Sequence, residues 1–517
     1  MKEAAGLGST ENILELLLSQ AERVPDRKAI IDKHGSMTFK ELVSAISSRA
    51  TYFKKVGLRS GDRVLVFMPM SISLYIDCLA VFGLGATVVF LDEWVDKKRL
   101  NLCCEIARCR AFIAPLKIKM LGFVFSSGLR EIPIKITGGK RQSGTPDGTI
   151  AAKQISEQNE TALITFTTGS TGRPKAVKRT HRFLLRQFNA LSSELNLEGE
   201  EVDMTSLPIV LLINLAGGIT SVIPDWKSSK PKTIKPKIIW NQIQNYEVSR
   251  ITASPFFLES LAKYQLKSGR NSESVTKLFT GGAPVFPGQA QKISSAFSNG
   301  ELKVVYGSTE AEPISVISGR SLMLKEESMM DSGLCVGTLH DNIELKIIQW
   351  KDQPLKQNDL EELELPLAEI GEIVVSGEHV LDEYFDSEEA FRRNKIVVDG
   401  VCWHRTGDGG RISEEGLLFL TGRCSQEIEH NGKKYHPFLI EYSLSKIRGV
   451  ELGTMLEING EPNILVQLQR GASQEDLTHQ IQKVVGKFKV GFVDFIPRDK
   501  RHFSKIDYQE LLDKNLW

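Results

Sequence analysis

The stretch TALITFTTGSTGRPK, residues 161–175, has two halves of different character. Its first half is an apolar run with the β-branched residues of a buried strand. Its second half is rich in glycine and hydroxyl side chains and ends in two cations, Arg173 and Lys175. Glycines let backbone N–H groups turn towards an anion, and the hydroxyls and cations add donors and positive charge. The stretch therefore predicts a strand that leads into a phosphate-binding loop.

This loop is not a Walker A loop. That motif has four residues between its glycines and ends in Gly-Lys-Ser/Thr. Here two residues separate Gly169 from Gly172, and Pro174 precedes Lys175. Composition alone also fits a flexible surface turn, because Gly, Ser and Thr favour loops. The candidate phosphate-binding residues are Thr167, Thr168, Gly169, Ser170, Thr171, Gly172 and Lys175.

Outside this stretch, roughly the first 330 residues alternate short Val- and Ile-rich runs with helical patterns. Successive βαβ units of a parallel sheet require this alternation. Residues 13–24 have apolar side chains at helical spacing, and Pro25 ends that pattern before a strand at residues 29–32. Residues 37–56 are predicted to form a helix with Thr38 as its cap.

The pattern changes beyond Asp331, where extended segments such as residues 343–348 and 371–376 are separated by polar stretches. Residues 422–429 follow a predicted strand and lead into about 90 residues with their own strands and terminal helix, enough for a small domain. We expect an α/β protein with a large N-terminal domain, residues 1–422, and a small mobile α+β domain, residues 423–517. The large domain would hold two βαβ-type subdomains and a β-rich subdomain at about residues 331–422.

Composition excludes several classes of function. Lys and Arg number 65 against 64 Asp and Glu, so no net field attracts nucleic acid or an anionic membrane. The seven Cys lack CxxC spacing and are expected to be reduced packing residues. The N-terminus has no signal-peptide pattern, which predicts a cytoplasmic location. Gly and Pro interrupt the apolar stretches 64–91 and 207–224, so we expect buried α/β elements there and no membrane span.

Four further segments occur in a fixed order after the loop: TGGAP at residues 280–284, YGSTE at 306–310, HRTGD at 404–408, followed by Gly422-Arg423, and a C-terminal stretch at 497–507 that contains Lys505. With the loop, and with GDRV at residues 61–64, they resemble the motifs of the adenylate-forming superfamily, which includes acyl-CoA synthetases, peptide-synthetase adenylation domains and firefly-type luciferases. Alone, each segment fits a turn or a solvated surface charge; the match in order over nearly the whole chain makes that interpretation improbable.

The resemblance implies a role for each residue. Tyr306 would stack on adenine, Thr309 would bind the α-phosphate of ATP, and Glu310 would hold Mg²⁺, a cation that prefers oxygen ligands. Thr168 would bind Mg²⁺ together with Glu310. Lys505 would reach the substrate carboxylate and the α-phosphate. The implied catalytic residues are Lys505, Thr309, Glu310 and Lys175, and the implied nucleotide-binding residues outside the loop are Gly281, Gly282, Ala283, Pro284, Tyr306, Gly307, Asp408 and Arg423.

The implied reaction is ATP-dependent activation of a carboxylic acid as an acyl-adenylate, with release of pyrophosphate. Details such as YGSTEAEPIS at residues 306–315 are similar to fatty-acid CoA ligase-like β-lactone synthetases of bacterial olefin biosynthesis. That branch implies a fatty or 3-hydroxy fatty acid substrate and partner enzymes of a lipid or olefin pathway. The adenylate would then pass to coenzyme A or close to a β-lactone through its own hydroxyl.

Departures from the family pattern bear on this second step. Ser425 stands where the superfamily has an acidic or lysine hinge residue, Glu429 where a basic residue is common, and Ala176 replaces a glycine. Ser425 fits either a thiol-independent second step or a neutral loop position. The absence of an Asp in residues 207–214 disfavours an amino-acid substrate, and the apolar segments 209–215 and 255–258 favour either an aliphatic pocket or ordinary core.

Two other functions stay open at this stage. One is a catalytically weak nucleotide-binding protein of the same fold, although Lys505 and Glu310 are both present. The other is adenylation of a different carboxylate for loading onto a carrier protein.

Overall fold

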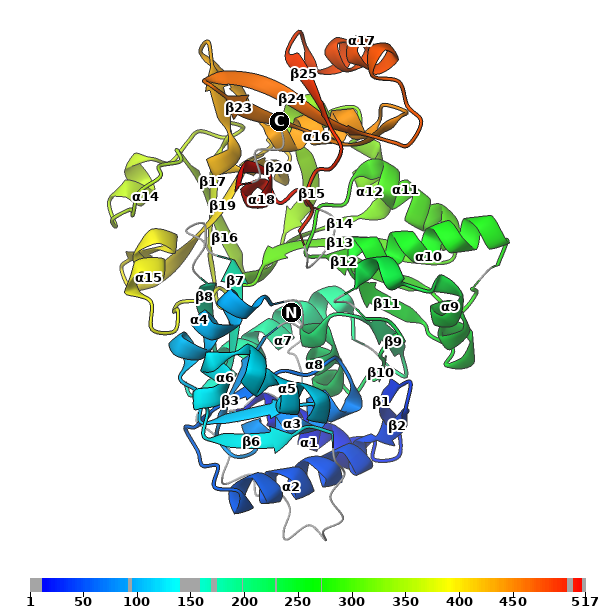
Figure 1. Ribbon diagram of the computed structural model, residues 1–517, viewed down its shortest axis with the longest axis vertical. Helices are drawn as coiled ribbons and strands as arrows, with labels where there is room; N and C mark the ends of the chain where they lie inside the picture. The colour runs from blue at the N-terminus through cyan, green and yellow to red at the C-terminus, as the bar shows by residue number, and fades with distance from the viewer. Residues whose placement is uncertain are drawn as a thin grey trace.

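The computed structural model describes residues 12–91, 95–139, 159–168, 174–197, 199–227, 230–270, 272–499 and 505–513. These residues form a large N-terminal α/β part and a smaller C-terminal lobe (Figure 1). The expected α/β fold class is therefore confirmed.

The first sheet has six strands in the order β6-β5-β3-β4-β7-β8. All neighbouring pairs are parallel except β7 with β8. Both faces are buried: Val64 and Val66 of β3 belong to one hydrophobic core and Leu65 to another. Burial of both faces is expected where helices cover a parallel sheet. The strands are β3 (Arg63–Val66), β4 (Thr87–Phe90), β5 (Ala111–Ala114), β6 (Ile134–Thr137), β7 (Thr161–Thr168) and β8 (Pro174–Thr180).

A second, longer sheet begins with a parallel half. Its strands run in the order β1-β10-β9-β11-β12-β13, and β2 pairs antiparallel with β1 at the edge. The bounds are β1 (Lys28–Asp32), β2 (Gly35–Thr38), β9 (Val202–Thr205), β10 (Thr220–Val222), β11 (Arg250–Ala253), β12 (Lys277–Gly281) and β13 (Glu301–Ser308).

The same hydrogen-bonded path continues through antiparallel strands into the β-rich region expected at residues 331–422. β14 pairs with β13 of the parallel half on one side and with β15 on the other. The β-rich region therefore shares a sheet with the subdomain before it. The bounds are β14 (Ala311–Ser318), β15 (Leu334–Leu339), β16 (Ile343–Ile348), β17 (Gly371–Gly377), β18 (Lys395–Val398), β19 (Val401–Ile412) and β20 (Leu417–Arg423).

The helices of the large part pack on these sheets, and a core that includes residues of α1, α2, α3, α7 and α8 lies between the two sheets. The bounds are α1 (Ile13–Arg23), α2 (Phe39–Lys55), α3 (Ile72–Phe82), α4 (Lys97–Ala107), α5 (Leu116–Phe125), α6 (Ser127–Glu131), α7 (His181–Leu195), α8 (Pro208–Gly217), α9 (Pro236–Asn245), α10 (Pro255–Ser268), α11 (Pro287–Ala296), α12 (Gly319–Leu324), α13 (Met329–Ser332), α14 (Asp359–Glu362) and α15 (Glu388–Asn394), with a 3₁₀ turn at Pro231–Thr233.

The expected cap of the second helix is present, but the helix begins later than predicted. Thr38 Oγ1 accepts a hydrogen bond from the backbone N–H of Glu41, and the Glu41 carboxylate accepts one from the Thr38 N–H, which is a complete capping box. The predicted start at Met37 was wrong because Met37 pairs with Ile30 across β1 and β2 and is buried there.

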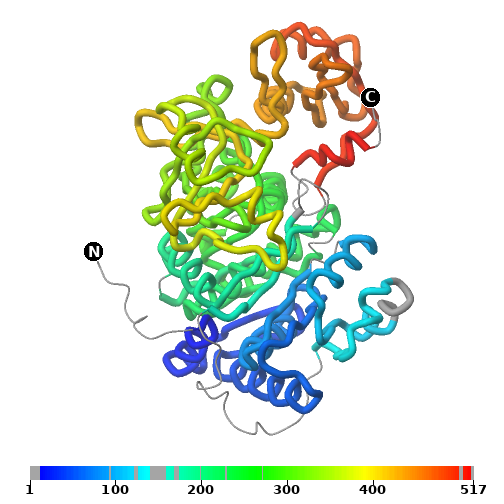
Figure 2. The backbone as a smooth tube through the Cα atoms, turned by 90° about the vertical axis from the view of Figure 1, so that its left-hand side faces the viewer, coloured from blue at the N-terminus to red at the C-terminus, as the bar shows by residue number. Residues whose placement is uncertain are grey.

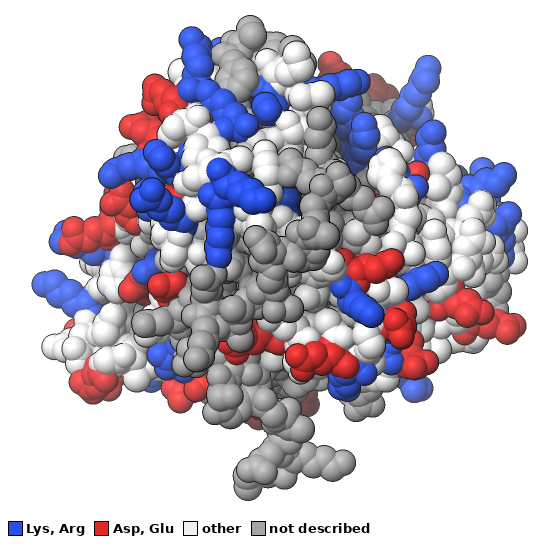
Figure 3. Space-filling view, turned by 90° about the horizontal axis from the view of Figure 1, so that it is seen from below, with Lys and Arg blue, Asp and Glu red and all other residues white. Residues whose placement is uncertain are grey.

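The two apolar stretches fold within the large part. Residues 64–91 form β3, α3 and β4, and residues 207–224 form α8 and β10. None of the helices in the described ranges combines the length and apolar composition that crossing a bilayer requires. The face of the molecule in Figure 3 carries basic and acidic side chains side by side, as the balanced composition predicts.

The C-terminal lobe has its own three-stranded sheet, β23-β24-β25, and its own hydrophobic core around Leu444, Met455 and Ile481. Figure 2 shows it at one end of the molecule, with α18 on the side that faces the large part. The bounds are a 3₁₀ turn at Cys424–Gln426, β21 (Ile428–His430), β22 (Lys433–Tyr435), α16 (Pro437–Ser445), β23 (Val450–Ile458), β24 (Glu461–Leu468), α17 (Gln474–Val485), β25 (Lys489–Val493) and α18 (Tyr508–Asp513).

Glu441 of α16 gives this lobe a pH-dependent stability. Its carboxyl accepts hydrogen bonds from Thr454 Oγ1 at 3.0 Å and from Tyr508 Oη. Burial raises the pKa of Glu441 from 4.5 to about 7. Between these two pH values the folded protein keeps a proton that the unfolded chain has lost, so the contribution of Glu441 to the free energy of unfolding falls as pH rises.

We therefore expect Glu441→Gln to gain stability relative to the original protein as pH rises from 5 to 8. The amide keeps an acceptor for Thr454 and Tyr508 and carries no charge to bury. Urea unfolding followed at several pH values measures the difference, with the exposed Glu429→Gln as the control. A difference in the free energy of unfolding between the variant and the original protein that stays constant over this pH range would contradict the expectation.

Candidate active site

A cleft of about 1460 Å³ lies where the two sheets and the C-terminal lobe meet. Its lining includes Thr167 at the end of β7, Tyr306 of β13, Asp408 of β19, Ile209 of α8 and Lys505 of the C-terminal lobe. The segments that the sequence singled out therefore line one cavity, although they lie far apart along the chain.

One end of the cleft holds Thr167 and Lys175, which pair across β7 and β8. Lys175 Nζ donates a hydrogen bond to Asn394 Oδ1 at 3.0 Å. Burial lowers the pKa of Lys175, while the negative charge of Glu310 opposes that effect. Of the loop, Gly169, Ser170, Thr171, Gly172 and Arg173 lie outside the described residues, and Thr168 is placed as the last residue of β7.

Thr309 and Glu310 lie at the turn between β13 and β14 and line the same end. Tyr384 Oη donates a hydrogen bond to Glu310 Oε1 at 3.2 Å. The backbone carbonyl of Thr309 accepts a hydrogen bond from Arg179 Nη2 at 3.1 Å. These two contacts hold the turn, one at the Thr309 main chain and one at the Glu310 carboxylate. Sequence reasoning missed Arg179 and Tyr384, because neither belongs to a recognisable motif.

Tyr306, Asp408 and Arg423 are in contact, although Tyr306 and Asp408 are 102 positions apart. Tyr306 Oη donates to Asp408 Oδ2 at 2.9 Å, and Arg423 Nη1 lies 3.3 Å from Asp408 Oδ1. Burial, and then the Asp408 charge, raise the pKa of Tyr306 well above its usual value, so its phenol stays a neutral donor. Arg423 also donates to the carbonyl of Thr406 at 2.8 Å. A hydrogen bond and an ion pair thus join the three predicted residues into one group.

The glycines near this group allow strands to approach closely. A Cβ atom on Gly281 would lie 2.5 Å from the carbonyl oxygen of Val305, and one on Gly307 would lie 2.8 Å from that of Ala311. Gly282 has φ +76°, a conformation that favours glycine. The segment from Gly281 to Pro284 lines the cleft together with Gly307. Backbone geometry therefore requires these glycines whether or not they contact a ligand.

Arg405, the arginine of the HRTGD segment, borders the cleft, and its guanidinium group is held in a network of protein contacts. It is buried and forms an ion pair with buried Glu372, with Arg405 Nη2 2.6 Å from Glu372 Oε2. It also donates to the backbone carbonyls of Lys351 and Gln353. This network fixes β19 against β17, and the strand in turn carries Asp408.

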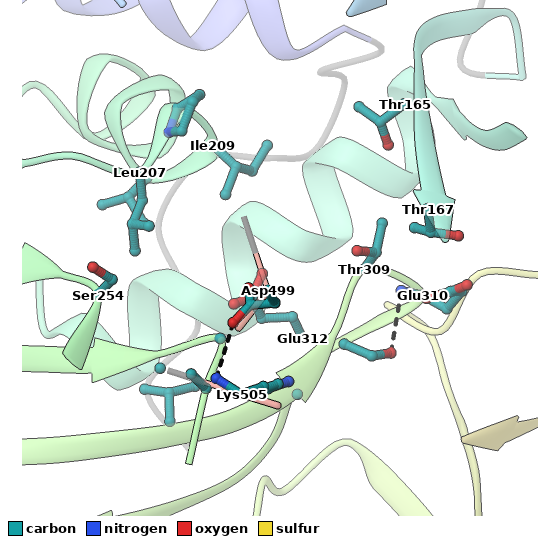
Figure 4. A pocket seen from close by; sticks show the side chains of 18 of the residues that line it. Thr165, Thr167, Leu207, Ile209, Ser254, Thr309, Glu310, Glu312, Asp499 and Lys505 are labelled. Atoms are coloured by element: carbon teal, nitrogen blue, oxygen red, sulfur yellow. Dashed lines mark hydrogen bonds between the residues drawn. The ribbon is translucent and has the colours of Figure 1, made fainter. Parts of the chain in front are cut away.

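Lys505 lies at the edge of the C-terminal lobe with its side chain exposed and lines the cleft. Its backbone N–H donates to Asp499 Oδ1 at 2.9 Å, and the Asp499 N–H donates to the Lys505 carbonyl. In Figure 4, Thr167, Thr309 and Glu310 lie on one side of the cavity, Leu207, Ile209 and Ser254 on the other, and Lys505 lies between them. Its ammonium group therefore belongs to the same cavity as the polar end and the apolar wall.

An apolar arm of the cleft extends between the two sheets. Segment 209–215 contributes Ile209, Val210 and Leu212, as expected for an aliphatic pocket. Residues 255–258 do not: Pro255, Phe257 and Leu258 are buried residues of α10, and the cleft is lined just before this helix by Thr252 and Ser254. Other apolar side chains of the arm are Tyr75, Leu79, Phe82, Leu191, Leu195, Ile223 and Trp226.

The chain is similar to known ligases in sequence and in fold. The chain is 29% identical to an olefin β-lactone synthetase of Stenotrophomonas maltophilia over 92% of this chain and 90% of the relative. It is 25% identical to 4-coumarate–CoA ligase 5 of Oryza sativa over 92% and 89%. O-succinylbenzoate coenzyme A synthetase of Bacillus subtilis, solved with AMP, superposes with a TM-score of 0.76 at 23% identity, covering 97% of this chain and 98% of that one.

The family model described as AMP-binding enzyme matches residues 17–385, well over half of the chain. This range holds the predicted phosphate-binding loop, the Gly281 segment and the Tyr306 to Glu310 segment, and the last two line the cleft. The protein is therefore an AMP-forming ligase that belongs to the AMP-binding enzyme family.

Proposed function

We propose that the protein activates an aliphatic carboxylic acid, a fatty or 3-hydroxy fatty acid, as an acyl-adenylate. The observation that carries this proposal is the position of Lys505 between the polar end of the cleft and its apolar arm. A carboxylate held at the mouth of the arm would lie beside both Lys505 and the α-phosphate of ATP bound at the polar end. Attack of that carboxylate on the α-phosphorus releases pyrophosphate.

The residues divide this work between them. The carboxylate and the triphosphate are both anions, so positioning and positive charge at the reacting atoms make the largest contribution to rate. Lys505 and Lys175 supply charge from two sides. Thr309 supplies a hydroxyl beside the α-phosphate, and Tyr306 and Asp408 hold the nucleoside. The boundary between the two domains is proposed at residues 422 and 423, directly before the 3₁₀ turn that contains Ser425.

Glu310 suits a site for Mg²⁺. Within the described ranges no three His, Cys, Asp or Glu side chains converge to enclose a metal. Mg²⁺ in nucleotide sites is usually held by one or two carboxylates, water and the substrate phosphates, so the single carboxylate of Glu310 fits this cation. When bound, Mg²⁺ would neutralise charge on the phosphates. Glu310 itself is kept in place by Tyr384.

Two experiments test this function. ATP-pyrophosphate exchange over a panel of carboxylic acids identifies the acid and measures adenylation. Identifying the nucleotide product separates adenylation from a γ-phosphoryl transfer, because the first releases AMP and the second ADP. Release of ADP, or no exchange with any aliphatic acid, would sink the proposal.

For the second step we propose closure of a β-lactone, supported by the similarity to β-lactone synthetases and by Ser425 at the hinge position. The 3-hydroxyl oxygen attacks the acyl carbon, the bond to AMP breaks, and the hydroxyl proton is lost. Incubation of the protein with ATP, Mg²⁺ and a 3-hydroxy fatty acid, with and without coenzyme A, decides between lactone and thioester. A product that forms only with the thiol favours acyl transfer to coenzyme A. Partner enzymes of a lipid or olefin pathway and a cytoplasmic location stay predictions.

Replacing Asp408 should weaken ATP binding selectively. In the proposed complex its carboxylate accepts hydrogen bonds from the ribose hydroxyls, and hydrogen bonds to a charged group contribute about 1.5–3 kcal/mol each. We expect Asp408→Ala to raise KM for ATP by roughly ten- to a hundredfold and to leave KM for the acid within about twofold, on that range of energies. Initial rates at varied ATP measure this, with exposed Asp476→Ala as the control. Equal changes in both KM values would contradict the role.

A further inference from the structure

Lys395, the first residue of β18, is a buried lysine that the proposed chemistry does not use. Its side chain is 2% exposed. Lys395 Nζ donates a hydrogen bond to the backbone carbonyl of Leu381 and lies 5.7 Å from the centre of the Tyr384 ring. Burial of an ammonium group is costly unless its surroundings compensate for the lost water. A lysine in this position therefore needs a physical reason.

The segment that Lys395 contacts holds Glu310. The backbone N–H of Leu381 donates to the carbonyl of Glu310 at 2.7 Å, and Tyr384 Oη donates to Glu310 Oε1 at 3.2 Å. Val380 also forms an isolated β-bridge with Ala311. Residues 380–384 thus contact Glu310 through both its main chain and its carboxylate, and Lys395 contacts the same segment from its buried side.

The electrostatic surroundings of Lys395 also link it to Glu310. Burial lowers the pKa of Lys395 to about 8, and the negative charges of Glu310 and Asp382 oppose that effect. His404, which is buried beside it, has a lowered pKa and stays neutral. Asn394, the residue before Lys395, accepts the hydrogen bond of Lys175. Asn394 therefore contacts Lys175 directly, and Lys395 contacts the segment that holds Glu310.

We propose that Lys395 is a positioning residue for Glu310: its buried ammonium group fixes residues 381–384, and through Leu381 and Tyr384 it fixes the direction of the Glu310 carboxylate. The inference rests on the proposed role of Glu310 towards Mg²⁺. It assigns no contact between Lys395 and a substrate.

The test replaces Lys395 with methionine, which has a similar length and no charge. Mn²⁺ binding, read by electron paramagnetic resonance in the presence of α,β-methylene-ATP, should weaken at least tenfold. The Mg²⁺ concentration that half-saturates ATP-pyrophosphate exchange should rise by a similar factor, while KM for the acid should stay within twofold. A lysine that only stabilised the fold would lower the unfolding temperature and leave the metal affinity of the folded protein unchanged.

Tyr384→Phe keeps the buried ring and removes the hydrogen bond to Glu310. We expect it to weaken Mn²⁺ binding as well, and we expect the double variant to lose less than the product of the two single effects, because both act through one path. Lys325→Met is the matched control, since Lys325 is a partly buried lysine that forms an ion pair with Glu415, outside residues 380–384. It should bind Mn²⁺ as the original protein does.

Unchanged Mn²⁺ binding in a folded Lys395→Met variant would overturn the proposal, as would independent effects in the double variant. If Lys395→Met does not fold, Tyr384→Phe decides: normal Mn²⁺ affinity there removes the path from Lys395 to the carboxylate. Failure of the proposed function has a different signature, namely the absence of pyrophosphate exchange in the original protein with every acid.

Discussion

Replacing Lys505 with alanine is expected to lower the rate of ATP-pyrophosphate exchange at least about a hundredfold, because loss of one preorganised charge at a reacting centre typically costs on the order of 3 kcal/mol in barrier. The ammonium group lies between the polar end of the cleft and its apolar arm, where two anions have to approach each other. No neighbouring side chain of the C-terminal lobe is proposed to replace it. The effect should fall on kcat more than on KM, because the charge on the reacting atoms changes most in the transition state.

The fold should tolerate this change. Lys505 is exposed, and the hydrogen bonds that hold it to Asp499 at both backbone positions survive in an alanine variant. Unfolding temperature and circular dichroism test this directly. Lys483→Ala, an exposed lysine on α17 of the same lobe, is the matched control and should exchange pyrophosphate normally. Normal exchange in the Lys505→Ala variant would remove Lys505 from the mechanism.

Glu310→Gln should have the second largest effect. We expect the rate of ATP-pyrophosphate exchange at low Mg²⁺ to fall about a hundredfold or more, because here too a charge that stabilises the transition state is lost. Glutamine has nearly the same volume, and its amide oxygen still accepts the hydrogen bond of Tyr384. The variant therefore loses the charge and keeps the packing. High Mg²⁺ should restore part of the rate, since the phosphates of ATP hold the cation as well.

Rates measured against free Mg²⁺ at fixed ATP separate this effect from a general loss of activity. Glu378→Gln is the control, because Glu378 is an exposed carboxylate that does not line the cleft and whose ion pair with Arg186 spans 3.6 Å. A Glu310→Gln variant with an unchanged rate and an unchanged Mg²⁺ dependence would show that the cation is held elsewhere.

Local patterns in the sequence were sufficient for the main elements of the fold. The βαβ alternation, the Thr38 cap and the Gly and Pro breaks in the apolar stretches each depend on residues within one or two turns of each other. The structure confirms α1 and β1 where these patterns predicted them, and it has helices and strands in both apolar stretches. The predicted start of α2 was wrong because Met37 belongs to β2, where it pairs with Ile30. Helical spacing in the sequence does not encode that contact.

The candidate site was predicted residue by residue, yet its supporting contacts were not. Tyr306 and Asp408 stand in recognisable motifs, whereas Tyr384, Asn394 and Lys395 have no local pattern that marks them. Their importance comes from hydrogen bonds to Glu310, Lys175 and Leu381 across loops and strands. For residues 255–258 the sequence left an aliphatic pocket and ordinary core both open, because an apolar side chain looks the same in sequence whether it faces a cavity or the core, and the structure shows core.

The sequence by itself determined the family-like order of motifs, the α/β class and the chemical groups available for a phosphate and a carboxylate, because each depends on residue type and short spacing. Only the tertiary structure decided that Lys505, Glu310 and the apolar arm border one cavity, and that the buried Lys395 contacts the segment that holds Glu310. Such proximity results from how sheets and lobes pack over long stretches of chain, and burial and charge acquire their effect on a side chain only once that packing exists.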